Sequence, residues 1–289
     1  MPSKAPVACP RFHEWIFITP FLLLAFRSAI VHPILHPSTL FPLVILFLLA
    51  AIIRIDQTRP SPLTHWARLL ILPILAVITY FRLGVDVPAL SLFRADAALL
   101  ALDRSLFGET PAVTLLHWHH PFLSELFSTC YLLFYLALIA YHIAWVRSGL
   151  RAATPFFAGI YSLYGIGFLG YILLPAVGPW KLPELQLAPH PPGGPVTTLN
   201  HWIVRNGSNG VDVFPSLHCA LTLFMVSHDW PQRRRRRFFL ALPPAIGLCL
   251  STLYLGYHYA VDVLAGFTLA ALALASTARS PARPTRPSP

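Results

Sequence analysis

Two histidines and one aspartate, His218, His258 and Asp262, interrupt apolar stretches that could cross a membrane without polar residues. His258 and Asp262 fall four residues apart within the apolar segment 251–277. On a helix, residues at that spacing share one face, so the carboxylate can approach the imidazole. His218 follows Ser216, whose type favours a helix start, so it is expected in a first helical turn. A charged carboxylate at membrane depth is costly unless it is paired or functional, and these residues therefore indicate a site.

Such a set of residues suits displacement at phosphorus. One imidazole, held in one tautomer and made more basic by a carboxylate, attacks the phosphorus, while a second, protonated imidazole donates a proton to the leaving oxygen. Serine hydrolysis is the competing use of a serine, a histidine and an aspartate. It is disfavoured because Ser216 lacks the Gly-x-Ser-x-Gly turn that exposes a nucleophilic serine.

The composition indicates an all-α integral membrane protein. Of the 289 residues, 56% are hydrophobic and only 11% are charged, whereas soluble domains carry about 25% charged residues. The net charge of +10 would suggest nucleic-acid binding in a soluble chain. In a membrane protein, the cytoplasmic loops collect Lys and Arg, so no nucleic-acid partner is expected.

No metal or other cofactor is expected from the sequence. The four cysteines (Cys9, Cys130, Cys219 and Cys249) lack the short paired spacings of zinc or redox sites. The cluster His117, His119 and His120 has no carboxylate or thiol to complete a ligand set, and adjacent positions on a helix point apart.

The hydropathy pattern predicts about eight transmembrane helices, because roughly 20 apolar residues are needed to cross the hydrocarbon core. They are expected at residues 14–31, 39–54, 67–83, 123–146, 154–174, 214–230, 237–256 and 259–277. Pro20 and Arg27 interrupt the first of them.

Positive charge alternates between the two sides of this arrangement, as the positive-inside rule requires. The loops on one side hold Arg54, Arg59, Arg68, Arg147, Arg151 and arginines 233–237. Both termini are therefore placed in the cytoplasm, and the long loops 84–122 and 175–213 outside. His218 and His258 then meet at the outer surface of the cytoplasmic membrane.

The two outer loops differ in character. An apolar-periodic stretch from Leu90 to Leu106, closed by Gly108, predicts an amphipathic helix at the interface. The loop 175–213 is rich in Pro, Gly and His and is expected to be an irregular cap over the spans. The tail 279–289 is expected to be disordered.

At these residues the sequence resembles the type 2 phosphatidic acid phosphatase superfamily, most closely its inositol phosphorylceramide synthase branch. The second motif of that superfamily, Pro-Ser-Gly-His, is similar to residues 215–218, and His258 and Asp262 have the spacing of the third motif. Thr252 stands where the classical third motif has Arg. The first motif of that superfamily is Lys, six residues, Arg-Pro. Here only Lys181 matches at that spacing, with Ala188-Pro189 in place of Arg-Pro.

The resemblance implies a metal-independent phosphohistidine mechanism. His258 would be the nucleophile, Asp262 its orienting partner and His218 the general acid. Six core helices would lie in residues 67–278, with two further helices in residues 1–66. Because the third-motif Arg is missing, other cations must hold the phosphate. Lys181, Arg205 and Arg82 are the candidates, of which Lys181 and Arg205 are favoured, with Ser216 and Asp212 as further substrate-binding residues.

The expected function is that of a membrane lipid phosphoesterase or phosphotransferase that takes a lipid substrate from the bilayer. The branch resemblance favours transfer of an inositol-phosphate, sphingolipid or phospholipid head group. Plain hydrolysis of a lipid phosphate or a prenyl pyrophosphate is the alternative. A different class, a lipid transporter or scaffold without catalysis, is suggested by the missing cations, although transporter sites usually lie near the bilayer midplane.

Overall fold

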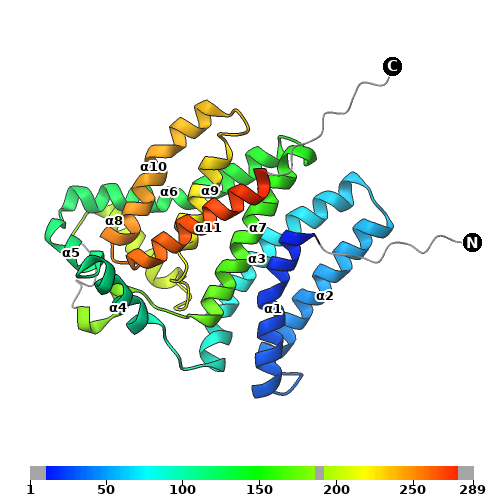
Figure 1. Cartoon of the computed structure of the whole chain (residues 1–289), viewed down its shortest axis with the longest axis horizontal. Helices are drawn as coiled ribbons and strands as arrows, with labels where there is room; N and C mark the ends of the chain where they lie inside the picture. Colours follow the sequence, from blue (N-terminus) through cyan, green and yellow to red (C-terminus); the bar gives the residue numbers. More distant parts are fainter. Residues whose placement is uncertain (1–10, 186–191, 279–289) are drawn as a thin grey trace, which may run out of the picture.

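The computed structural model describes residues 11–185 and 192–278, and these residues fold into helices without strands (Figure 1). In chain order the α-helices are α1 (Phe12–Val31), α2 (Pro37–Thr58), α3 (Pro62–Leu90), α4 (Asp96–Phe107), α5 (Pro111–Thr114), α6 (Pro121–Val146), α7 (Leu150–Leu173), α8 (Pro195–Gly207), α9 (Leu217–His228), α10 (Arg235–Tyr254) and α11 (Ala260–Ala278). Short 3-10 turns lie at Leu115–Trp118, Pro179–Lys181 and Pro183–Leu185.

Seven of these helices are long and apolar enough to cross a membrane: α1, α2, α3, α6, α7, α10 and α11. The chain is thus an all-α integral membrane protein, as the composition indicates. The interrupted first span is one continuous helix with Pro20 inside it.

The sixth expected span, residues 214–230, is shorter than the sequence predicts. Its helix, α9, has 12 residues, which rise only about 18 Å at 1.5 Å per residue. The side chain of Ser216 accepts a hydrogen bond from the N–H of Cys219 and so caps the helix start. Phe214 and Pro215 therefore precede the helix instead of belonging to it.

The most buried of the candidate spans is α7, and other segments approach its glycines closely. A Cβ on Gly165 would lie 2.5 Å from the carbonyl oxygen of Ile16 in α1, and one on Gly170 would lie 2.3 Å from Cδ of Pro215. These two glycines therefore mark close contacts of α7 with neighbouring segments. Gly170 also lets the segment that leads to His218 lie directly against α7.

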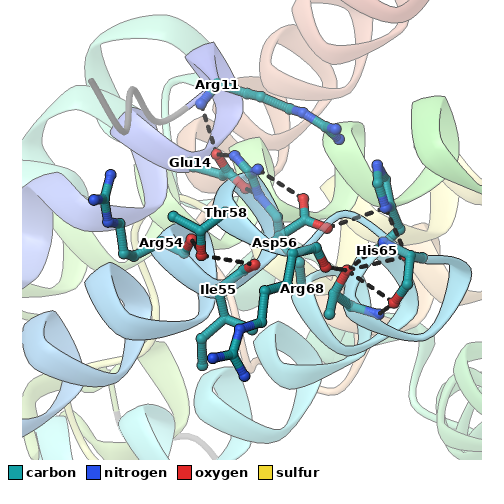
Figure 2. Close-up of polar contacts among 11 residues, drawn as sticks. Arg11, Glu14, Arg54, Ile55, Asp56, Thr58, His65 and Arg68 are labelled. Carbon is teal, nitrogen blue, oxygen red and sulfur yellow. Dashed lines mark hydrogen bonds and ion pairs between the residues drawn. The ribbon is translucent and has the colours of Figure 1, made fainter. Parts of the chain in front are cut away.

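A buried ion-pair network joins α1, α2 and α3 at one end of the bundle (Figure 2). Arg68 contacts both carboxylate oxygens of Glu14 at 2.6 Å and donates to Asp56 at 3.0 Å. All three side chains are at most 5% exposed. Nδ1 of His65 lies 3.0 Å from the other oxygen of Asp56. Each carboxylate is therefore neutralised within the protein.

The two long loops contain more helix than the sequence predicts. The interfacial helix is present as α4, ending at Gly108 with φ +83°, but it starts at Asp96 because α3 continues to Leu90. The loop 175–213 is not entirely irregular, since α8 lies within it. Glu125 of α6 accepts hydrogen bonds from the N–H groups at the start of α8, a contact that local sequence patterns do not reveal.

Candidate active site

A small pocket lies where α9 and α11 begin. Its cavity volume is about 40 Å³, several times the roughly 10–15 Å³ that one water needs. The lining residues are Tyr80, Tyr131, Tyr135, Val177, Trp180, Val204, Gly207, Ser208, Asp212, Val213, His218, Tyr257 and His258. The pocket is thus of a size for a phosphate-like group, while a lipid chain must lie outside it.

The structure brings the two predicted histidines together in this pocket. Their ring centroids are 6.0 Å apart. On one side of the His258 ring, Nδ1 lies 3.5 Å from Oδ2 of Asp262. On the other side, Nε2 lies 3.4 Å from Oγ of Ser216. His258 therefore has its carboxylate behind it and its second nitrogen on the side of Ser216.

Asp262 connects the segments that carry the two histidines. Its Oδ2 accepts a 2.9 Å hydrogen bond from the N–H of Tyr259, and its backbone carbonyl accepts one from the N–H of Ser216 at 3.1 Å. Both Ser216 and Asp262 are fully buried. The expected contact between His258 and Asp262 is present, but a turn ahead of α11 forms it, because the helix begins only at Ala260.

The charge around His258 favours its protonated form. Burial of the ring opposes the imidazolium, but the nearby Asp262 carboxylate outweighs burial, and Asp212 adds to its effect. The pKa of His258 is consequently raised above its usual value. A higher pKa goes with a more basic, more nucleophilic neutral imidazole.

The second histidine, His218, is surrounded by aromatic rings. Its Nε2 lies 3.2 Å from the hydroxyl of Tyr131, and the ring of Phe134 packs 4.8 Å from its own. These partners come from α6, whose tyrosines the sequence offers only as common bundle residues. The ring is therefore held in place from α6 while still lining the pocket.

Asp212 lies in the pocket among hydroxyl groups. The hydroxyl of Tyr80 donates a short hydrogen bond to it, and that of Ser208 donates at 3.0 Å. Sequence reasoning missed Tyr80, which reaches the site from α3 across 132 residues. A second missed hydroxyl is that of Tyr257; burial raises its pKa, so it stays protonated and can donate.

The two candidate cations differ in their placement. Nζ of Lys181 lies 3.4 Å from Oγ of Ser208, a pocket-lining residue. Burial lowers the pKa of Lys181, Asp212 counteracts this, and Arg94 adds to it. Arg205 lies on the exposed side of α8, and the pocket lining does not include it. The structure thus brings Lys181 to the edge of the site but leaves Arg205 away from it.

No cation replaces the third-motif Arg at position 252. The hydroxyl of Thr252 donates to the carbonyl of Cys249 within α10 and is fully buried. Residues Ala188 and Pro189, which would continue the first motif, lie outside the described residues. Among the residues that the structure describes, no group of three or more His, Cys, Asp or Glu side chains is placed to hold a metal ion.

Two buried aspartates of α4 hold the loops that border the pocket. Asp103 accepts hydrogen bonds from the N–H groups of Ala260 and Val261 at 3.0 and 2.9 Å. Asp96 accepts from the N–H groups of Val177 and Gly178 at 3.0 Å. No local sequence pattern pairs either aspartate with these backbone groups, which lie more than 80 residues away along the chain. Asp103 thus fixes the backbone that follows His258, and Asp96 fixes the backbone that precedes Trp180.

Comparison with known families decides the relationship of the chain. The family model of the PAP2 superfamily matches residues 97–276. The chain belongs to the PAP2 superfamily. Neither curated proteins nor solved structures give a significant match. The matched region runs from α4 to α11 and contains His218, His258 and Asp262, and membership supports a membrane lipid phosphatase-type function.

Proposed function

We propose that this protein transfers the phosphate-containing group of a membrane lipid through a phosphohistidine intermediate. The observation that carries the proposal is the meeting of His218 and His258 in one pocket, with Asp262 behind His258. The PAP2 superfamily match over the same residues supports it. The catalytic unit would be residues 67–278, with residues 1–66 as an addition.

In the first step, Nε2 of neutral His258 attacks the phosphorus of the substrate. A nitrogen–phosphorus bond forms, and the bond from phosphorus to the leaving oxygen breaks. Protonated His218 gives its proton to that oxygen, so the alcohol leaves neutral. Asp262 holds the ring by its Nδ1 side and stabilises the positive charge that develops on it.

In the second step, neutral His218 takes a proton from the incoming acceptor. The oxygen of that acceptor attacks the phosphorus, and the nitrogen–phosphorus bond breaks. His258 is then neutral and His218 protonated, as at the start. Water as the acceptor gives hydrolysis, whereas an alcohol gives head-group transfer. No metal takes part in either step of this scheme.

The phosphate oxygens would be held by Lys181, Ser216 and the tyrosine hydroxyls of the pocket, whereas Arg205 lies outside the pocket lining and is set aside. Hydrogen-bond donors aimed at the developing charge stabilise a transition state most when water is excluded. Asp212 is an acceptor, so we assign it to a hydroxyl of the substrate head group or of the acceptor.

The favoured reaction is transfer of an inositol-phosphate or another phospholipid or sphingolipid head group. The Asp212 carboxylate in the pocket supports transfer, because the hydroxyl groups of an attacking polyol need hydrogen-bond acceptors. Hydrolysis of a lipid phosphate or a prenyl pyrophosphate is the second candidate, supported by the small volume of the pocket. In both, the lipid comes from the bilayer and the reaction takes place at the outer face of the cytoplasmic membrane.

The test is release of phosphate and head groups from a panel of lipid phosphates and phosphodiesters by purified protein in EDTA. Wild type is compared with His258→Ala, with and without inositol or glycerol as acceptor. We expect turnover that survives chelation and disappears in the variant. If neither protein turns over any lipid, and millimolar vanadate does not protect the folded protein against heat, a non-catalytic lipid scaffold replaces the proposal.

A further inference from the structure

A second cavity lies at the opposite end of the bundle from the histidines. It lies at the starts of α1 and α7 and the end of α11, and its volume is about 660 Å³. That volume falls within the roughly 300–1,000 Å³ of small-molecule sites. Asp262 lies in the first turn of α11, whereas Ser276 and Thr277 of the cavity lie in its last turn. The length of α11, about 28 Å at 1.5 Å per residue, therefore separates the two sites.

The polar groups of this cavity are mainly donors. Its lining comprises Arg11, Phe12, His13, His65, Leu150, Arg151, Thr154, Pro155, Ala158, Ser162, Ser276 and Thr277. Two guanidinium groups and two imidazoles are present, and the described lining residues include no carboxylate. The four hydroxyl groups of the lining already donate to backbone carbonyls of their own helices. The guanidinium and imidazole groups are complementary to an anion.

The nearest carboxylates, Glu14 and Asp56, already have ionic partners, and of the lining residues only His65 lies against one of them, at 3.0 Å from Asp56. Glu14 and Asp56 both contact Arg68 in the buried network. Figure 2 shows the guanidinium of Arg11 extending away from that network, although the backbone N–H of Arg11 donates to Glu14. The positive charge of Arg11 is thus available to a ligand.

One polar atom at the cavity lacks a partner. Among the described residues, Nε2 of His13 is buried and has no hydrogen-bond partner. A buried polar group without a partner costs about 1–3 kcal/mol. A phosphate oxygen in the cavity would satisfy it.

We propose that this cavity binds the head group of an anionic phospholipid from the leaflet opposite the catalytic site. The phosphate would contact Arg11, Arg151 and His13, while the acyl chains would leave along the apolar part of the lining, at Phe12, Pro155 and Ala158. Basic pockets between membrane helices, at the level of the head groups, are suited to such lipids. A soluble phosphate would gain nothing from the apolar wall.

The full-length protein in phosphatidylcholine nanodiscs provides the test. A small fraction of photoactivatable phosphatidylglycerol, with a diazirine on its acyl chain, is added, and the labelled peptides are mapped by mass spectrometry. The peptides that carry residues 150–162 and 274–277 are expected to be labelled, and free glycerol phosphate is expected not to compete. Mapping the label separates this cavity from the pocket of His258.

Two variants and one control decide the outcome. Arg11→Gln/Arg151→Gln should reduce labelling of these peptides at least fivefold, and Ala158→Phe, which fills the cavity without changing the charge, should reduce it similarly. Arg54→Gln/Arg59→Gln removes the same charge from exposed positions at the end of α2 and should leave the labelling unchanged.

Three results would overturn the proposal. The first is equal labelling by a photoactivatable phosphatidylcholine, and the second is equal loss in the Arg54/Arg59 control. The third is competition by glycerol phosphate, which would make the site one for a soluble phosphate. None of these readouts depends on turnover, so failure of the catalytic scheme would leave the result interpretable.

Discussion

The carboxylate of Asp103 accepts a 3.0 Å hydrogen bond from the backbone N–H of Ala260, the first residue of α11. Asp103 is fully buried, and its charge also lies near the N-terminus of α11, where the helix dipole favours an anion. Because Ala260 follows His258 by two residues, a side chain of α4 fixes the backbone next to the proposed nucleophile.

We expect Asp103→Asn to lower both stability and activity. Asp103 accepts from Ala260, Val261 and Thr110, and an amide has one oxygen fewer, so an N–H at the start of α11 loses its partner. The expected cost is about 1–3 kcal/mol. Thermal unfolding in detergent and lipid turnover measure the two effects. The control is Glu109→Gln, an exposed carboxylate in the same loop; equal effects of the two substitutions would contradict the role of Asp103.

His258→Ala is expected to abolish turnover, and Asp262→Asn to reduce it by about 10²–10⁴-fold, the range for groups that assist proton transfer. The reason is that His258 would form the covalent bond, whereas Asp262 would orient it. Trapping of an acid-labile, base-stable phosphoenzyme from labelled substrate provides the measurement. A labelled intermediate in His258→Ala would assign the nucleophile elsewhere.

His218→Gln should discriminate between leaving groups. A general acid matters most when the leaving oxygen is a poor leaving group, so a lipid alcohol should react far more slowly in the variant, whereas p-nitrophenol should leave almost as fast as in wild type. Comparison of kcat/KM for the two substrates in both proteins gives the result. An equal loss for both substrates would mean that His218 does not act as the acid.

The pH dependence should follow the protonation of His258. Only its neutral form can attack, and its pKa is raised because Asp262 outweighs the effect of burial. Activity should therefore fall as the pH drops through this raised pKa. In Asp262→Asn the carboxylate that raises the pKa of His258 is gone, so this pKa should fall and the residual activity should persist to lower pH. A pH profile of kcat/KM for both proteins shows the direction of the shift.

Glu14→Gln should destabilise the packing of α1 on the rest of the bundle. The substitution replaces two charge-assisted hydrogen bonds from Arg68 with weaker contacts to a neutral amide, while Asp56 still pairs with Arg68, so the expected cost is about 1–3 kcal/mol. Arg68→Met alone should cost more, because Glu14 and Asp56 both lose their guanidinium partner, and adding Glu14→Gln to it should recover part of that loss by removing one of the two uncompensated charges. Unfolding temperatures of the two single variants and the double variant measure the coupling. Strictly additive losses would show that the pair does not interact.

Seven of the eight expected transmembrane helices and the proximity of His218, His258 and Asp262 could be predicted from the sequence, because they leave local patterns. The length of the apolar segments identifies the spans, and the four-residue spacing of His258 and Asp262 predicts their contact. The placement of His218 beside His258 followed from the alternation of charged loops.

The supporting contacts could not be predicted in this way. Tyr80 meets Asp212 and Asp103 meets Ala260 across 132 and 157 residues, and no local pattern encodes such pairs. The helix α8 depends on Glu125 of another segment for its start. Exposure of Arg205 could not be inferred either, since it depends on which face of α8 packs against α6.

The shortness of α9 has a consequence for the way the bilayer acts on this protein. Most of its side chains are buried among neighbouring helices, so α9 does not need to match the thickness of the hydrocarbon core. Hydrophobic mismatch is accommodated by helices that face lipid, through tilt or local thinning. The helix that carries His218 is therefore shielded from direct contact with lipid. A thicker or thinner membrane acts on it only by moving the helices that enclose it.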